Sequence, residues 1–293
     1  MFDLLLPTVS QGLLWSMLAL GVFLTFRVLD IADLTVEGSF PLGAAVAAAC
    51  LVKGGNPFTA IVLAAIAGGL AGVITGLLHT KLKIPALLAG ILTMIALYSV
   101  NLRVMGKANL SLLRVDTVFT YLRNMGLDNN MSIFTVGIIS TVLFVLAIYW
   151  FFGTEIGAAI RATGFNPQMI RAQGVDTNHT IIFGLLLSNA LVAISGAFIG
   201  QSNGFADVGM GVGTIVIGLA SVIIGEVLFG TRSFKNSLIS VVLGSVVYRI
   251  VIAVVLQMGM PPNDLKLFTA VLVALALALP LFQNKINKRK VAE

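Results

Sequence analysis

Two stretches of the chain, DLTVEGSFPLGAAVAAA at 33–49 and FADVGMGVGTIVIGLA at 205–220, decide the fold. Each places a carboxylate before a run of small residues that leads into an apolar helix. Each follows one long apolar segment and precedes further ones. Non-helical backbone is tolerated at membrane depth only where protein or a water-filled cavity supplies hydrogen-bond partners. Interruptions at matching positions therefore indicate a transport pathway between two halves of inverted topology.

Close packing between helices is the alternative explanation of these glycines, because small residues let backbones approach. For any single glycine that alternative is the simpler one, and Asp207 has the further alternative of capping a helix. The paired pattern favours a pathway. We expect its residues to be Glu37, Gly38, Asp207, Gly209, Gly211, Gly213 and Glu226.

The composition is that of a membrane protein. Of the 293 residues, 58% are hydrophobic and only 10% are charged. A soluble domain has about 25% charged residues, so the composition excludes a soluble enzyme and a disordered chain. The fold class predicted is all-α and polytopic, because apolar runs reach the roughly 20 residues that a membrane-spanning helix needs. Nine spans are expected, near 8–27, 39–53, 57–79, 84–102, 133–152, 180–201, 208–230, 236–257 and 267–283.

Lysine and arginine near the span ends predict the orientation, because cytoplasmic segments carry an excess of both. The basic tail at 284–293 holds the densest cluster, so we expect the C-terminus in the cytoplasm of a cell-membrane protein. Nine spans place the N-terminus outside; a re-entrant 39–53 reverses that end. We expect a single transmembrane domain over 1–293, with an N-terminal half at 8–132, a central span and cytoplasmic loop at 133–180, and a C-terminal half at 180–283.

The cytoplasmic loop GTEIGAAIRATGFNPQMIRAQGVDTNHT, at 153–180, is longer than a turn requires. It predicts a short helix over 158–163, a break at Gly164–Phe165 and a second helix over 167–173. Asn166 can cap the second helix and Gly174 can end it. Two such helices suit docking into the groove of a partner, or resting on lipid headgroups. The apolar side of the second helix comprises Met169, Ile170 and Ala172.

This loop resembles the permease subunits of bacterial ABC importers of the branched-chain amino acid type. The family pattern there is G-x-x-x-R-A-x-x-x-N followed by A-x-x-x-G-[VI]. The resemblance covers most of the chain and is strongest over 155–230. It rests on Gly157–Gly164, Asn166–Pro167 and Ala172–Val175 in the loop, on Phe183–Gly200, Gly209–Gly213 and Ile224–Gly225 downstream, and on Asp33–Gly38 and Leu42–Ala44 upstream.

The resemblance implies that two copies, or this chain and a relative, form a pore in the lipid bilayer. It implies a separate ABC ATPase subunit that docks on the loop, and an extracytoplasmic solute-binding protein that delivers a small solute. The solute expected is an amino acid of branched-chain or aromatic type. Glu226 departs from the family, which has a small residue there. The coupling residues implied are Ala159, Arg161, Ala162, Gly164, Asn166, Pro167, Arg171, Ala172 and Gly174.

Several other functions lack their motifs. No G-x-x-x-x-G-K-[ST] occurs, so ATP hydrolysis is expected on another chain and this chain is not expected to be an enzyme. His79 and His179 lack metal-ligand spacing, and we expect no bound metal or cofactor and no nucleic acid. The competing hypothesis is an ion-coupled secondary transporter with inverted repeats, which Glu226 keeps open. A buried salt bridge between Glu226 and Arg249 is the structural alternative for that carboxylate.

Overall fold

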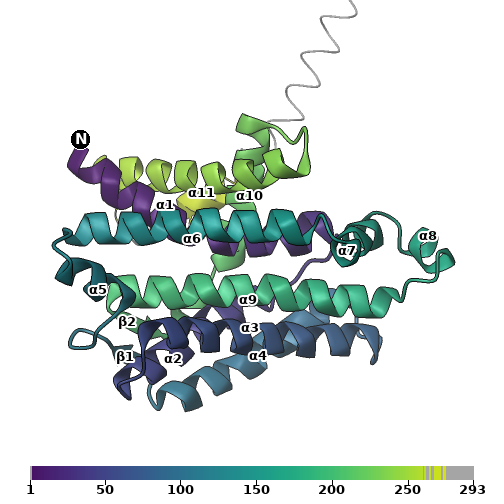
Figure 1. The fold of residues 1–293 in the computed structure, drawn as a ribbon, viewed down its shortest axis with the longest axis horizontal. Helices are drawn as coiled ribbons and strands as arrows, with labels where there is room; N and C mark the ends of the chain where they lie inside the picture. Colours follow the sequence, from purple (N-terminus) through teal and green to yellow (C-terminus); the bar gives the residue numbers. More distant parts are fainter. Residues whose placement is uncertain (1, 260, 262–263, 265–266, 272, 275–293) are drawn as a thin grey trace, which may run out of the picture.

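The computed structural model describes residues 2–259, 261, 264, 267–271 and 273–274, which form a helical bundle with two short strands (Figure 1). Seven helices in the described part are long and apolar enough to cross a membrane. The elements are α1 (Phe2–Phe23), the π-helical turn η1 (Leu24–Val28), α2 (Val36–Val52), α3 (Pro57–Thr80), α4 (Ala86–Met105), β1 (Asn109–Ser111), α5 (Val118–Asn124), α6 (Asn129–Phe151), α7 (Glu155–Phe165), α8 (Pro167–Ala172), α9 (Thr177–Asn203), β2 (Phe205–Asp207), the 3₁₀ turn η2 (Val208–Gly211), α10 (Thr214–Phe229) and α11 (Phe234–Gln257).

Helix α9 lies at the centre and packs against α1, α2 and α3. Small residues make the contact with α2 possible. A Cβ added to Gly43 would overlap the backbone of Ala193, and one added to Gly196 would overlap the backbone carbonyl of Phe40. Helices that approach this closely gain van der Waals contact where lipid provides no hydrophobic driving force. The Gly- and Ala-rich composition of α2 is therefore explained by its position beside α9.

The two ends of the bundle carry different structures (Figure 1). At one end, α7 and α8 project beyond the long helices; we call this the α7–α8 end. At the other end, β1 pairs with β2 in antiparallel register, with Asn109 opposite Asp207, and α5 lies nearby. We call this the β-ribbon end, and α1 begins there.

The predicted spans agree with the helices wherever the structure describes them. The predicted segment 39–53 corresponds to α2, which is shorter than the others. Its residue Leu51 packs with Leu110 and Leu112 of the β-ribbon end, so α2 reaches that end and is not re-entrant. The segment 267–283 and the tail at 284–293 lie largely outside the described residues.

Two details of the 153–180 loop differ from the sequence prediction. Helix α7 continues through Gly164 and ends at Phe165, with Asn166 as its C-cap, because Gly164 serves a close approach to η1 and not a chain break. Of the predicted apolar side of α8, only Ile170 is buried, whereas Met169 and Ala172 are exposed. The Asn166 cap is present, and Gly174 has a φ of +87°, as a helix-ending glycine requires.

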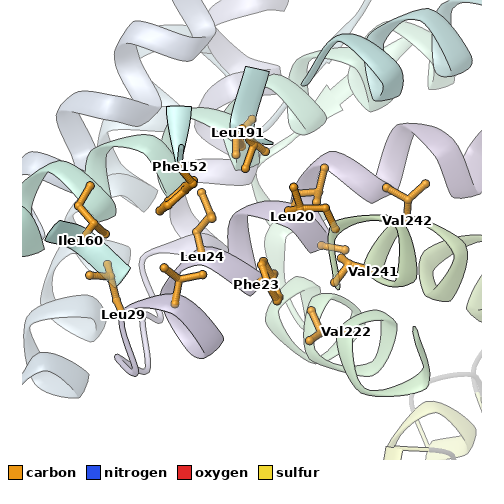
Figure 2. Close-up of a cluster of buried hydrophobic side chains, with 14 of the residues drawn as sticks. Leu20, Phe23, Leu24, Leu29, Phe152, Ile160, Leu191, Val222, Val241 and Val242 are labelled. Carbon is orange, nitrogen blue, oxygen red and sulfur yellow. The ribbon is translucent and has the colours of Figure 1, made fainter. Parts of the chain in front are cut away.

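The largest buried cluster joins α7 to the centre of the bundle (Figure 2). Ile160 of α7 and Phe152 lie beside Leu24 and Leu29, at the end of α1 and η1. The same cluster continues through α1 to α10 and α11. Close packing of this kind transmits a displacement instead of absorbing it. We therefore expect α7 and the end of α1 to move together.

Candidate functional site

Both stretches that the sequence singled out interrupt the helical path. After η1 the chain runs without helical structure beside α9, where Leu29 contacts Gly184, and α2 begins only at Val36. After α9 the chain returns beside α2, and α10 begins only at Thr214. Helix α2 runs towards the β-ribbon end. Helix α10 runs towards the α7–α8 end, where its Glu226 pairs with η1. The two halves thus have the inverted topology that the sequence predicts.

Buried hydrogen bonds hold the first break. Asp33 accepts one from Asn189 Nδ2 at 2.7 Å and one from the backbone N–H of Thr35 at 2.9 Å. The Thr35 hydroxyl lies 2.7 Å from that of Thr75, which donates to Thr93 at 2.9 Å. All five side chains are buried. Because unpaired polar groups are costly away from water, this network fixes the path of the non-helical segment between η1 and α2.

The second break meets the first at the start of α2. Glu37 Oε1 accepts a hydrogen bond from the backbone N–H of Gly213 at 3.0 Å. A Cβ on Gly211 would overlap the carbonyl of Glu37. Gly213 has a φ of +84°, a conformation that favours glycine. The sequence therefore grouped Glu37, Gly211 and Gly213 correctly in space.

A cavity of about 340 Å³ opens beside Glu37, between α2, α4 and η2. Asn101 of α4 donates from Nδ2 to the Gly38 carbonyl at 3.3 Å, and its buried Oδ1 has no hydrogen-bond partner. Glu37 and Asn101 both line the cavity, with Tyr98 and Ser99 beside them and no lysine or arginine. The apolar wall consists of Met94, Ile95, Val208 and Val212. The Glu37 carboxylate thus favours a hydrogen-bond donor in this cavity, above all a positively charged one.

Asp207 and Gly209 lie at the β-ribbon and do not line this cavity. Asp207 Oδ1 accepts from the Gly209 N–H at 2.7 Å, and its Oδ2 accepts from Asn109 Nδ2 at 3.2 Å. Asp207 therefore caps η2 and anchors β2 to β1. This is the structural alternative that its sequence context allowed.

Glu226 lies apart from the other predicted pathway residues, at the α7–α8 end, and pairs with Arg27 of η1. The expected Glu226–Arg249 salt bridge is wrong. Gly225 meets α11 at Ser240, so Arg249 lies about 13 Å further along the helix. The Arg249 guanidinium instead lies over the ring of Trp15, with 4.1 Å between Cζ and the ring centroid.

Helix α7 is attached directly to the first break. Gly164 faces the Val28 carbonyl, which a Cβ would overlap. The hydroxyls of Thr163 and Thr180 lie 2.8 Å apart, which links α7 to α9. Ile160 is fully buried. One side of α7 therefore packs against η1. The chain leaves η1 as the non-helical segment that precedes α2.

Helix α8 stands on the outer side of this attachment. Phe165 is 90% exposed and Met169 45% exposed. The Asn166 side chain accepts from the backbone N–H groups of Gln168 and Met169 at 3.1 and 3.0 Å. Arg171 donates to the hydroxyl of Thr177, which fixes α8 to the start of α9. The loop thus presents an exposed apolar tip, formed by Phe165 and Met169. Hydrogen bonds to Asn166 and Thr177 fix the position of α8.

The other predicted coupling residues surround this tip. Ala159 and Ala162 are half-buried on α7, whereas Pro167, Ala172 and Gly174 are exposed. Arg161 is exposed, with its Cζ 5.2 Å from the centroid of the Phe234 ring. At the start of α9, the backbone N–H of Asn178 holds the pKa of the Asp176 carboxyl below its ordinary value, and His179 adds to this effect.

Sequence reasoning missed two amides. Asn189 holds Asp33 at the first break, and Asn101 lines the cavity. Each is a lone polar side chain within an otherwise apolar span, which is a signal of function or of interhelical bonding. Asp33 stands in the quoted stretch but was not selected, because nothing in the sequence shows its partner.

An inverted bundle with two interrupted helices that meet beside a cavity with one carboxylate and an apolar wall is typical of a membrane transport permease. A family model described as "Branched-chain amino acid transport system / permease component" matches residues 4–278. The chain therefore belongs to this family and is a permease subunit of an ABC transporter. It is a multi-pass membrane protein and not an enzyme, since ATPase activity in such transporters lies on a partner subunit.

Curated relatives agree with this assignment. The chain is 37% identical over 274 residues to a tyrosine transport system permease protein of Clostridioides difficile, covering 94% of this chain and 90% of the relative. It is 33% identical over 285 residues to an uncharacterised protein of Rickettsia prowazekii, covering 94% and 97%. An autoinducer 2 import system permease protein of Yersinia pseudotuberculosis is 29% identical over 64% of this chain and 52% of its own length.

Among solved structures, the chain is similar to an inward-facing ABC transporter assigned to the metal-chelate type. The TM-score is 0.50 with 14% sequence identity, covering 96% of this chain and 85% of the other. At this identity the likeness concerns the fold alone.

Proposed function

We propose that the chain is the membrane subunit of an ATP-driven importer of a small amino-acid-type solute. It works with a separate ATPase subunit, an extracytoplasmic solute-binding protein and a second permease copy or a paralogue. The α7–α8 end and the C-terminus face the cytoplasm of a cell-membrane protein. The observation that carries this proposal is the structure of the loop. Its exposed apolar tip stands at the end of α7, and α7 packs against η1 at the first break.

The contacts form a continuous route from the loop to the cavity. A displacement of α7 moves η1 through the Gly164–Val28 contact. The segment that follows η1 is fixed by Asp33, so the displacement reaches α2 and with it Glu37. ATP binding to a partner subunit that contacts α8 would thus change the position of Glu37 in the cavity, although this chain itself binds no nucleotide. A ligand shifts such an equilibrium only as far as it binds the two states differently.

The cavity beside Glu37 supports a pathway shared with a second permease chain. Glu37 is half-buried near the surface of the chain, and the irregular segment 208–213, which begins with the 3₁₀ turn η2, lies beside it. A carboxylate and irregular backbone do not face lipid at membrane depth. This face therefore borders an aqueous route, and a second copy or a paralogue would close the other side.

The chemistry of the cavity supports an amino-acid solute. The Glu37 carboxylate offers an acceptor for an ammonium group, and the apolar wall suits a hydrocarbon or aromatic side chain. The volume of about 340 Å³ lies in the usual range for small-molecule sites. The name of the Clostridioides relative, a tyrosine transport permease, points to the aromatic class.

The structure removes the main argument for an ion-coupled secondary transporter, which rested on Glu226. Glu226, the carboxylate that kept that hypothesis open, is paired with Arg27. An ion-coupling carboxylate needs instead to exchange partners with the transported cation. The family assignment also favours an ATP-driven system.

Co-purification and uptake test the proposal together. The chain is co-expressed with a candidate ABC ATPase subunit from the same genome, and ATP-driven uptake of tyrosine is measured in proteoliposomes that contain a candidate binding protein. Phe165→Asp is expected to abolish ATPase co-purification, because it places a charge on the exposed apolar tip. Leu113→Asp is the matched control, since Leu113 is 85% exposed at the opposite end. Equal loss in both variants, or uptake driven by an ion gradient without ATP, contradicts the proposal.

A further inference from the structure

Two cavities at the α7–α8 end share Arg161 and Phe234 but differ in charge. The cavity on the α1 side, of about 600 Å³, contains Arg27 and Arg161 together with Glu226 and Asp30. The cavity on the α6 side, of about 640 Å³, contains Arg161 and Lys235 and no acidic residue. The first contains equal numbers of cationic and acidic side chains, whereas the second contains two cationic side chains, one of them shared with the first, and no acidic one.

Both cations of the α6-side cavity are available to an anion. Neither Arg161 nor Lys235 forms an ion pair with any residue that the structure describes. The ring of Phe234 lies under the Arg161 guanidinium at 5.2 Å. This contact orients the guanidinium without neutralising it. Ser233 and Thr154 add hydroxyls to the same cavity.

The rim of this cavity is aromatic and continues into an apolar surface. Tyr149 and Trp150 line the cavity at the last turn of α6, and Trp150 is 74% exposed. Tyrosine and tryptophan concentrate at the boundary between hydrocarbon and headgroups. From this rim, one side of the adjoining half of α6 bears exposed apolar residues: Ile139, Val142, Leu143 and Leu146.

An anion site that opens at the end of an apolar helix face fits an amphiphile. We propose that the α6-side cavity binds the headgroup of an anionic phospholipid, with its phosphate between Arg161 and Lys235 and its acyl chains along α6. Basic pockets between the ends of membrane helices bind such headgroups in this way. One headgroup would bridge α7 and α11, which already meet where the Arg161 guanidinium lies over Phe234.

Native mass spectrometry of the purified full-length chain tests this proposal without any transport assay. The chain is incubated with equimolar phosphatidylglycerol and phosphatidylcholine in detergent, and the retained lipid is counted. We expect preferential retention of phosphatidylglycerol, and a loss of about fivefold in Lys235→Ala because one cation near the surface is removed. Lys235→Arg is expected to restore retention. Arg232→Ala is the matched control, because Arg232 is exposed nearby but does not line the cavity.

Several outcomes would overturn the proposal. Equal retention of both lipids by the wild-type chain is one, and an equal loss in Lys235→Ala and Arg232→Ala is another. Retention of inorganic phosphate in place of the lipid would assign the cavity to a free anion and not to a membrane component. Lys235 is exposed, so its variants are expected to fold, and a thermal melt of each variant verifies this.

Discussion

The two helix breaks occupy equivalent places in the inverted halves, yet they are held in different ways. The first is fixed by a buried network around Asp33 and Asn189 and is packed against α7. The second is held by the β-ribbon, by the Asp207 cap and by one bond from Gly213 to Glu37. Repetition of topology therefore does not imply equal mobility.

This difference is consistent with different roles for the two breaks in transport. A segment anchored by buried, paired polar groups moves as a unit with its neighbours. A glycine-rich segment with few side-chain bonds changes conformation at lower cost. Under the proposed function, the first break transmits the displacement of the α7–α8 loop, and the second adapts around the solute.

The largest expected effect comes from removing the carboxylate that each break contains. Asp33→Leu leaves the Thr35 N–H without its partner and Asn189 with one bond fewer. We expect a loss of about 2–5 kcal/mol of stability, because these groups are buried. Asp207→Leu removes a half-exposed cap and should cost about 1 kcal/mol. Thermal melting in detergent measures both, and equal losses would remove the distinction between the breaks.

A smaller effect is expected where α7 meets the first break. Gly164→Val introduces a Cβ that overlaps the Val28 carbonyl. We expect a cost of about 1–3 kcal/mol from overpacking, a chain that still reaches the membrane, and ATP-driven uptake reduced more than ATP hydrolysis. Ala158→Val on the exposed side of α7 is the control. Unchanged coupling in Gly164→Val would show that the displacement takes another route.

The cavity beside the second break gives the next prediction. Glu37→Gln keeps an oxygen for the Gly213 N–H, so stability should change by less than about 0.5 kcal/mol. It removes the charge that attracts an ammonium group, and we expect the KM for tyrosine uptake to rise about tenfold. Asp116→Asn, outside the cavity, makes the same charge change. A shift of the same size in both variants would count against recognition by Glu37.

The smallest effect is expected at the junction of α8 and α9. The folded-state pKa of Asp176 is lowered, so its cap stabilises the start of α9 above the unfolded pKa. That contribution is lost as the pH falls through the folded pKa. Hydrogen exchange in the first turn of α9 should be faster in Asp176→Ala than in wild type at neutral pH. The two should converge in acid; a constant difference would contradict the cap.

The sequence located the breaks and the grouping of Glu37 with Gly211 and Gly213, because carboxylates and small residues before an apolar helix form a visible pattern. It misjudged Gly164, since a glycine that ends a helix and a glycine that admits a neighbour look alike in sequence. It paired Glu226 with Arg249 because adjacent spans suggested proximity, whereas the register of α10 on α11 separates them. It missed Asn101, whose free oxygen depends on a tertiary bond to Gly38.

Accessibility of the loop tip tests the central claim most directly. Phe165→Cys in a Cys50→Ser background gives a single cysteine at the most exposed point of the loop. A membrane-impermeant maleimide is applied to intact cells and to inverted membrane vesicles, with and without the ATPase subunit. The account predicts labelling only in inverted vesicles, and protection when the ATPase is present. Labelling of intact cells from outside would contradict it.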